Sequence, residues 1–162
     1  MNKKTHIDRD YDLFFKNLGT EKLAWLAGLF QSEAYFHSDK RVRAKSSPEE
    51  YTPPPPVPRI KLEMVEEDLM RHIGEILDEN VIITNRRTTA NNIVYKITIN
   101  ARNKSEAFLR AIEPFIIGRK THREIQDLLE LCEQYKDWVA QGGKQNAAKL
   151  ANKARQALRK KN

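Results

Sequence analysis

The sequence has very little cysteine and no long apolar run. Cys132 is the single cysteine among 162 residues, so no disulfide can form within one chain, which fits a reducing compartment. The longest apolar stretch, Leu23 to Phe30, is far shorter than the roughly 20 residues that a membrane helix needs. The polar and charged segment from Met1 to Lys16 is unlike a secretion signal. We therefore expect a protein that is not secreted and that works in the cytoplasm, in an organelle or inside a phage-infected host.

Histidine is also scarce, and its four copies are scattered along the chain: His6, His37, His72 and His122. They show none of the short spacings of zinc ligands, so we predict no zinc site. Hydrophobic residues make up 40% of the sequence and charged residues 31%, which suffices for a core beneath a charged surface. A chain of 162 residues is expected to fold as one compact domain with an appendage.

Acidic residues are missing from the C-terminal part of the chain, where none follows Asp137. Seven basic residues do follow it, and they match the net charge of +7: Lys144, Lys149, Lys153, Arg155, Arg159, Lys160 and Lys161. Without these seven, 22 of the 29 basic residues remain, against 22 acidic ones, so net charge alone does not make the main domain a nucleic-acid binder. The basic tail is predicted either as an arm over a phosphate backbone or as a helix packed back on the domain through Leu150 and Leu158.

Apolar periodicity and chain breaks divide the sequence into an N-terminal extension over residues 1–19, a main domain over 20–140 and the basic tail over 141–162. The main domain reads as helix, two strands, helix, two strands and further helices, which predicts an α+β fold with a four-stranded antiparallel sheet. The first helix is expected to start after an N-cap at Thr20. The expected helices cover residues 21–32, 66–80, 105–112, 121–139 and 147–161, and the expected strands cover 34–43, 57–65, 81–87 and 93–100.

The predicted strands alternate between apolar and polar side chains, as half-buried strands do. Toward the core we expect Ile60, Leu62 and Met64, and on a later strand Ile93, Tyr95, Ile97 and Ile99. The opposite face carries side chains that are able to reach phosphates or base edges. We predict as DNA-binding residues His37, Asp39, Arg41, Arg43, Arg59, Lys61, Glu63, Asn85, Arg86, Lys96, Thr98 and Asn100. A charged outer face is also typical of any solvated sheet, so this pattern alone favours DNA binding only slightly.

The stretch from Leu23 to Phe30 has no polar side chain, so a helix over it is apolar on every face and needs cover on every side. Three small residues recur in this region at intervals of four: Ala24, Gly28 and Ser32. This spacing lets two helix backbones approach closely. The partner is either the same helix of a second copy across a two-fold axis or ordinary packing within one chain, and the spacing does not decide between them. The dimer interface would contain Ala24, Trp25, Gly28, Leu29 and Ser32.

Glu33 follows this helix directly, where an acid faces the negative end of the helix dipole at a cost of roughly 0.3–1 kcal/mol. In a two-fold dimer its symmetry mate would lie nearby and add repulsion between like charges. Two carboxylates in such a position are suited to divalent cations, and oxygen ligands together with substrate phosphates suit Mg²⁺. A solvated glutamate at a frayed helix end is the alternative interpretation.

The segment Leu26-Ala27-Gly28-Leu29-Phe30-Gln31-Ser32-Glu33-Ala34 resembles the LAGLIDADG motif of homing endonucleases. Residues 58–69 resemble the strand that leads into the second helix of that family, and residues 114–125 resemble the entry to its later helix. The resemblance covers roughly residues 22–131, and three motifs in register are a strong signal. It implies that Glu33, with Ala34 beside it, is the metal-binding position of an active site.

The sequence departs from the family pattern at three positions. Gln31 replaces an acid that is often present in the motif, and Ala34 replaces its last glycine. Arg119 stands where the family often has a lysine, and Lys120 follows it. An arginine stays protonated and cannot act as a base, but it can stabilise negative charge in a transition state. The catalytic set that the resemblance implies is Glu33, Gln31, Arg119 and Lys120.

The resemblance implies a saddle-shaped sheet that binds double-stranded DNA, with two motif helices meeting at the centre. Roughly two or three Mg²⁺ ions per dimer active site would then activate water and stabilise the leaving oxygens. A chain with one motif is expected to act as a homodimeric, site-specific homing endonuclease on a long pseudo-palindromic target. The alternative on the same fold is a catalytically weak or inactive DNA- or RNA-binding protein, such as an intron maturase or a transcription regulator. An unrelated α+β interaction protein would instead be a monomer without affinity for nucleic acid.

Overall fold

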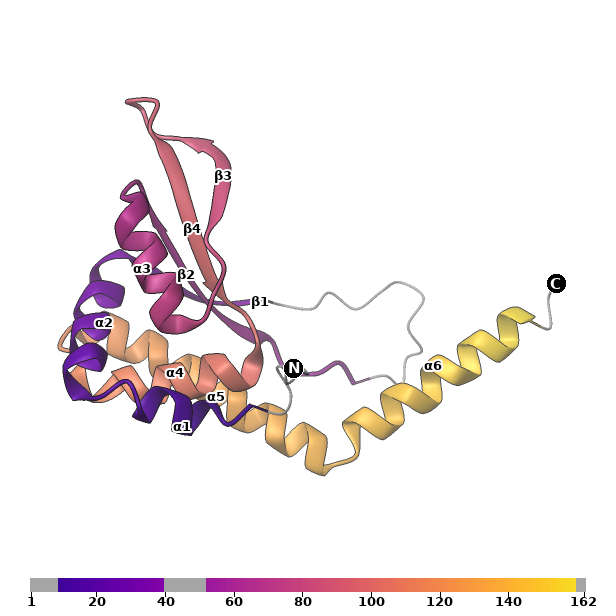
Figure 1. Cartoon of the computed structure of the whole chain (residues 1–162). Helices are drawn as coiled ribbons and strands as arrows, with labels where there is room; N and C mark the ends of the chain where they lie inside the picture. Colours follow the sequence, from indigo (N-terminus) through magenta and orange to yellow (C-terminus); the bar gives the residue numbers. More distant parts are fainter. Residues whose placement is uncertain (1–8, 40–51, 160–162) are drawn as a thin grey trace, which may run out of the picture.

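The computed structural model describes residues 9–39 and 52–159. The order of its elements confirms the predicted α+β fold with a four-stranded antiparallel sheet and C-terminal helices (Figure 1). No helix of these two ranges is long and apolar enough to cross a membrane. The elements are α1 (Tyr11–Lys16), α2 (Thr20–Glu33), β1 (Ala34–Asp39), β2 (Val57–Met64), α3 (Glu67–Leu77), β3 (Ile82–Arg87), β4 (Ile93–Ile99), α4 (Arg102–Ile112), the 3-10 helix η1 (Glu113–Phe115), α5 (Arg119–Ala140) and α6 (Gly143–Arg159).

The sheet has the strand order β1-β2-β4-β3, and its neighbouring strands are antiparallel. Ala34 of β1 lies opposite Leu62, and Asp39 lies opposite Val57 at the other end of this strand pair. One face of the sheet belongs to the core, where the predicted residues Ile60, Leu62, Ile97 and Ile99 are buried. Figure 1 shows α2, α3, α4 and α5 on one side of the sheet, so none of these four helices covers the other face, which is called the open face below.

The predicted alternation fails at the far end of the β3–β4 hairpin. Ile93 is 39% exposed and its neighbour Val94 only 6%, so the prediction that Ile93 points into the core is wrong. The pairing of β3 with β4 is irregular between Ile83 and Arg87, and a bulge of this kind changes which side chains share a face. Figure 1 also shows the hairpin extending past the helices, so that its tip has no core behind it.

Helix α2 is buried along one face rather than on every side. The core takes Leu23, Leu26, Ala27 and Phe30 from it. The opposite side, which carries Ala24, Trp25, Gly28 and Ser32, is exposed in the single chain. The N-cap is Gly19, with a φ of +83°, and not the predicted Thr20, which is the first helical residue. The all-apolar character of this helix therefore corresponds to a core face plus a face without cover in one chain.

The N-terminal segment and α4 meet in the same core. Tyr11 and Phe15 of α1 are buried there, and α1 packs against α4. Helix α4 begins at Arg102, earlier than the predicted start at residue 105. In its first turn Lys104 is 0% exposed, and its Nζ donates to Glu79 Oε1 at 2.6 Å and to the Asp78 carbonyl at 2.9 Å. Apolar periodicity does not anticipate a buried lysine, because its charge partner lies in a distant segment.

Cys132 is expected to be chemically inert in the folded protein. It is buried on α5, and burial raises the pKa of its thiol to about 11. Because the thiolate is the reactive form, at about pH 8 only roughly one thiol in a thousand is ionised. We expect a disulfide reagent to modify Cys132 at least about a hundredfold faster in denaturant than in native buffer, as followed by absorbance. Rapid modification of the native protein would contradict this burial.

Candidate active site and nucleic-acid interface

A cavity of about 520 Å³ opens at the C-terminal end of α2. The end of β2, the β3–β4 hairpin and the first turn of α5 also contribute to its walls. Four of the residues predicted as catalytic or metal-binding line it together: Gln31, Glu33, Ala34 and Lys120. Arg119 is exposed next to Lys120 but does not line the cavity. The structure therefore places Lys120, rather than Arg119, on the wall that faces the same space as Glu33.

Glu33 is the last residue of α2, whereas the sequence predicts it just beyond the helix end. Its side chain is exposed, and the N–H of Ala34 donates to the Phe30 carbonyl and closes the last helical turn. The carboxylate thus lies at the negative end of the helix dipole, where a nearby cation stabilises it. Carboxylate and carbonyl oxygens are the ligands that Mg²⁺ prefers, so Glu33 and Ala34 suit this ion.

One chain does not supply a complete set of metal ligands at this position. Across the described ranges, no three His, Cys, Asp or Glu side chains are grouped so that they would hold a metal ion. Glu63 lines the same cavity, but it pairs with Lys61 at 2.9 Å and with Arg86 at 3.1 Å. A divalent cation at Glu33 would therefore need further oxygen ligands from a second chain or from a substrate phosphate.

Gln31 joins the end of α2 to the loop that leads into α5. Its side-chain oxygen Oε1 accepts hydrogen bonds from the backbone N–H of Ile117 at 3.1 Å and of Gly118 at 3.2 Å. Gly118 is the N-cap of α5, so this contact fixes the start of the helix that carries Lys120. The sequence predicts a catalytic role for Gln31, and in the structure its side-chain oxygen links the two walls of the cavity.

Replacing Gln31 by leucine is expected to loosen the Ile117–Gly118 loop. The variant loses an acceptor for two backbone N–H groups. Because the loop is exposed, water can accept hydrogen bonds from these groups instead, so we expect the free energy of unfolding to fall by only about 1 kcal/mol. Hydrogen exchange of the Ile117 and Gly118 amides, followed by NMR, should become at least about fivefold faster. Gln31→Glu keeps the acceptor and should retain the protection. Equal protection in the leucine variant would show that the contact is not formed in solution.

The open face of the sheet carries ion pairs rather than isolated charges. Arg59 NH2 lies 2.7 Å from Asp39 Oδ2, across the β1–β2 pair. Glu63 is shared between Lys61 and Arg86, as described above. The predicted DNA-binding acids Asp39 and Glu63 thus hold predicted basic residues in place across neighbouring strands. Such pairs on a surface contribute little stability, about 0–1 kcal/mol each, and they orient long side chains.

The remaining predicted DNA-binding residues are spread over the same face and its rim. His37, Asn85 and Asn100 are exposed, and Lys96 and Thr98 are half-buried on β4. Lys96 lies opposite both Glu63 and Ile82 in the strand register. Asn100 lines a second cavity, near the start of α6, away from Glu33. Arg41 and Arg43 lie outside the described residues.

Tyr35 is an exposed aromatic residue that the sequence reading did not select. It is 65% exposed, lines the Glu33 cavity, and lies opposite Lys61 in the strand register. Lys61 Nζ is 5.8 Å from the centre of its ring. The signal was present in the sequence, because strand alternation places Tyr35 on the same face as His37 and Asp39. A planar side chain at this position is suited to stacking on a base.

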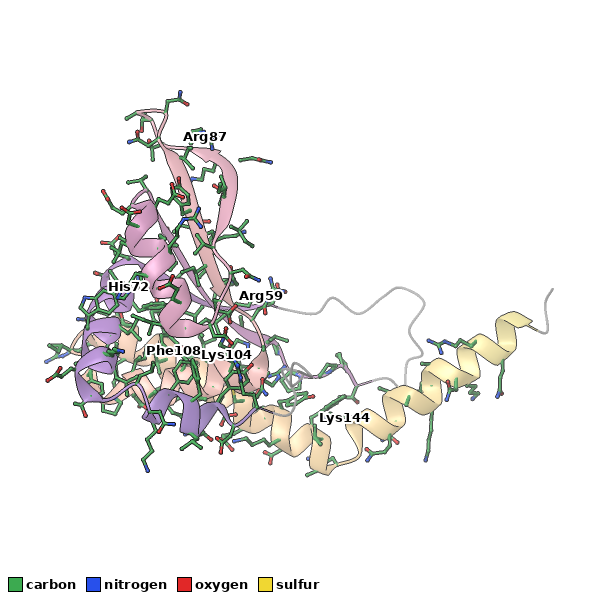
Figure 2. All side chains as sticks on the ribbon, viewed as in Figure 1. Arg59, His72, Arg87, Lys104, Phe108 and Lys144 are labelled. Carbon is green, nitrogen blue, oxygen red and sulfur yellow. The ribbon has the colours of Figure 1, made fainter. Side chains whose placement is uncertain are left out.

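The exposed side of α2 has room for close approach by another helix. A Cβ atom added at Gly28 would meet nothing within 4 Å. Ser32 Oγ donates back to the carbonyls of Gly28 and Leu29 on its own helix, at 3.2 and 3.0 Å, so it presents no unpaired donor. Trp25 is 42% exposed, and its ring lies next to that of His72, with ring centroids 6.2 Å apart. Figure 2 shows His72 close to α2, so the open side of α2 begins next to this ring pair.

Comparisons with known proteins identify the fold. Neither family sequence profiles nor characterised proteins give a match to this sequence. Among solved structures, homing endonuclease I-CvuI in complex with its target aligns with a TM-score of 0.53 and 16% identity, over 82% of this chain and 79% of that chain. Group I intron-encoded homing endonuclease I-CeuI, complexed with DNA, aligns with a TM-score of 0.55 and 13% identity, over 82% and 69%.

The meganuclease I-SmaMI bound to DNA gives a TM-score of 0.51 at 17% identity, over 79% of this chain and 42% of that chain. At such low identities the likeness establishes the architecture. The chain therefore has the fold of LAGLIDADG homing endonucleases, with a four-stranded antiparallel sheet and C-terminal helices.

Proposed function

We propose that this protein is a site-specific DNA endonuclease that makes Mg²⁺-dependent double-strand breaks in a long pseudo-palindromic target as a homodimer. One observation carries the proposal: α2 ends in the exposed carboxylate of Glu33 on an open cavity, beside an exposed helix side where Gly28 leaves space for a second helix. The DNA-bound structure neighbours support a DNA-binding endonuclease fold.

The dimer would form by crossing two copies of α2 at Gly28. Glu33 lies five positions further along the same helix, so a two-fold axis through this crossing would bring one carboxylate from each copy toward the centre. Each chain has one such carboxylate and no metal cluster of its own in the described part. A paired site therefore accounts for an acid that has no ion pair within residues 9–39 and 52–159 of a single chain.

Each wall of the cavity would have a separate part in phosphodiester hydrolysis. Glu33, with the carbonyl of Ala34, would hold Mg²⁺, and the bound ion would supply charge stabilisation at the scissile phosphate. Lys120 would hold its ammonium group toward the same phosphate and neutralise negative charge that develops there. Gln31 would keep these two walls at a fixed separation through the Ile117–Gly118 loop.

The open face of the sheet would read the target. Its basic residues already form ion pairs with acidic residues in the free protein, as Arg59 does with Asp39 and Arg86 does with Glu63. DNA phosphates would compete with these acids for the same basic side chains, which lowers the affinity for arbitrary sequences. Contacts with the bases would then determine which sequence is bound. Tyr35, next to Glu33, would contact bases close to the cleavage position.

The proposal is tested by cleavage of a randomised duplex library. The purified protein is incubated with the library in Mg²⁺, and cut ends are captured by ligation and sequenced. We expect one family of pseudo-palindromic sequences to be enriched, with cuts on both strands near its centre, and no enrichment with a chelator. If binding selection enriches a target that is never cut in Mg²⁺ or Mn²⁺, the endonuclease proposal fails.

That last outcome is the signature of a second candidate function, a DNA- or RNA-binding protein without cleavage activity. The observation in its favour is Arg119, which stands at the position of a common lysine in the family that the sequence resembles. Binding to folded RNA in competition with the selected DNA separates the two candidates.

A further inference from the structure

Helix α6 concentrates unpaired positive charge on one projecting element. Lys144, Lys149, Lys153 and Arg155 are all exposed, and no acidic residue follows Asp137 in the sequence. Within the part of the chain that the structure describes, none of these four cations forms an ion pair, and Lys144 only lies 5.9 Å from the ring of Tyr135. On the open sheet face, by contrast, Arg59, Lys61 and Arg86 each form an ion pair with an acidic side chain.

The four cations spread over about half of the helix circumference at 100° per residue. Ala147 and Leu150, which are half-buried, fall on the other half. The helix is rich in alanine, which favours helix formation without packing. Figure 1 shows α6 extending away from the sheet and from the other helices, so it does not fold back over the domain.

The root of α6 is held by an aromatic cluster at the end of α5. Tyr135 and Trp138 stack with centroids 5.6 Å apart, and the guanidinium carbon of Arg102 lies 4.0 Å from the centre of the Tyr135 ring. Arg102 also donates to the carbonyls of Pro55 and Pro56, at 2.8 and 3.0 Å. These contacts tie α5 and α4 to Pro55 and Pro56, which precede β2, and Lys144 at the start of α6 lies 5.9 Å from the same Tyr135 ring.

This root lies at the opposite end of the sheet from Glu33. Lys144 and Ala147 of α6 line a cavity with Val57, at the start of β2, whereas Met64, at the end of β2, lines the Glu33 cavity. The eight residues of β2 separate the two cavities by about 25 Å. From that outer end, the 17 residues of α6 reach about 25 Å further. Figure 2 marks Lys144 at this junction of α5 and α6.

We propose that α6 is a phosphate-binding arm that contacts the DNA backbone outside the segment covered by the sheet. The proposal rests on the proposed DNA-binding function. It extends the contacted DNA by about seven base pairs of flanking duplex at each end, which is the length of the helix divided by 3.4 Å per base pair. Contacts of this kind are independent of base sequence and lengthen the footprint without changing the recognised target.

An anionic membrane surface is the alternative partner for a basic helix that has an apolar side. That side of α6 is mostly alanine, and the one leucine whose side chain is described, Leu150, is already half-buried. Little apolar area remains for insertion among lipid chains, which needs large side chains. The observations therefore favour a phosphodiester backbone over a lipid surface.

The test compares salt dependence on short and long DNA. Binding of the full chain to mixed-sequence duplexes of about 20 and about 60 base pairs is measured by fluorescence anisotropy from about 50 to 200 mM KCl. The arm variant combines Lys144→Gln, Lys149→Gln, Lys153→Gln and Arg155→Gln, and glutamine preserves helix propensity. The control variant removes the same charge from the helix layer by Lys16→Gln, Arg71→Gln, Arg110→Gln and Lys136→Gln. Circular dichroism verifies that both variants fold.

On the long duplex, the arm variant should lower the slope of log affinity against log salt by about 3 per subunit and weaken binding at least about tenfold. On the short duplex it should match the wild type, and the control variant should leave the wild-type difference between the two duplexes intact. An unchanged slope on the long duplex overturns the inference. The inference is also overturned if the arm variant binds DNA as the wild type does but no longer binds vesicles of phosphatidylcholine and phosphatidylglycerol. If the wild type binds neither duplex at low salt, the proposed function itself fails.

Discussion

Replacing Glu33 by glutamine is expected to abolish metal-dependent DNA cleavage while leaving the fold and DNA binding intact. Glutamine keeps the size of the side chain but removes the negative charge at the exposed end of α2. Loss of about 4 kcal/mol of charge stabilisation in the transition state corresponds to about a thousandfold lower cleavage rate. Because the carboxylate opposes the helix dipole, its removal should raise the free energy of unfolding slightly, by about 0.3–1 kcal/mol.

The matched control is Glu21→Gln, which makes the same change of charge at the other end of the same helix. Glu21 is exposed in the first turn, far from the cavity, so cleavage should remain within about twofold of the wild type. Rates are measured on the selected target under single-turnover conditions, and affinity is measured in Ca²⁺. Undiminished cleavage by the Glu33 variant would remove this residue from the active site and with it the proposed mechanism.

Replacing Gly28 by leucine should stabilise the single chain and prevent dimer formation. A side chain at this position meets open space within one chain, and glycine costs about 1 kcal/mol relative to good helix formers inside a helix. In the proposed dimer the same side chain would occupy the place of the partner backbone and force the helices apart. We expect the dissociation constant of the dimer to rise at least about a hundredfold, with cleavage falling in parallel.

Analytical ultracentrifugation checks dimer formation, and thermal unfolding at a concentration where the wild type is also monomeric checks the stability of the single chain. Ala140→Leu serves as the control, since Ala140 is exposed at the end of α5 and should change neither dimer formation nor cleavage. A Gly28→Leu protein that still sediments as a dimer with full activity would place the contact between copies elsewhere. A loss of thermal stability would mean that α2 is not open on this side.

Much of the fold follows from periodicity in the sequence. The buried residues Ile60, Leu62, Ile97 and Ile99 follow from the two-residue repeat of strands, and the order of elements follows from the breaks between them. The same rule fails at Ile93, because the β3–β4 pairing is irregular there and no helix lies behind the hairpin tip. Periodicity describes one segment at a time, so it does not anticipate how two strands slip against each other.

The site was less accessible to sequence reasoning wherever it depends on distant contacts. The residue types and the motif single out Glu33 as a candidate, but the contact of Gln31 with Ile117 joins residues 86 positions apart and has no local signal. The choice between Arg119 and Lys120 likewise depends on how α5 is rotated at its start, and counting from a motif does not fix that rotation. The pairing of buried Lys104 with Glu79 is a third example.

The two tryptophans of the chain occupy positions that make them separate optical reporters. Trp25 borders the uncovered side of α2, so its emission should shift to the blue when a second chain covers that side. Trp138 stacks at the root of α6 and donates from Nε1 to the Thr52 carbonyl at 3.1 Å, so it responds to movement of that helix instead. With each tryptophan replaced in turn by phenylalanine, the variant that keeps Trp25 would time self-association, and the variant that keeps Trp138 would time docking of the helix on DNA, in separate stopped-flow traces.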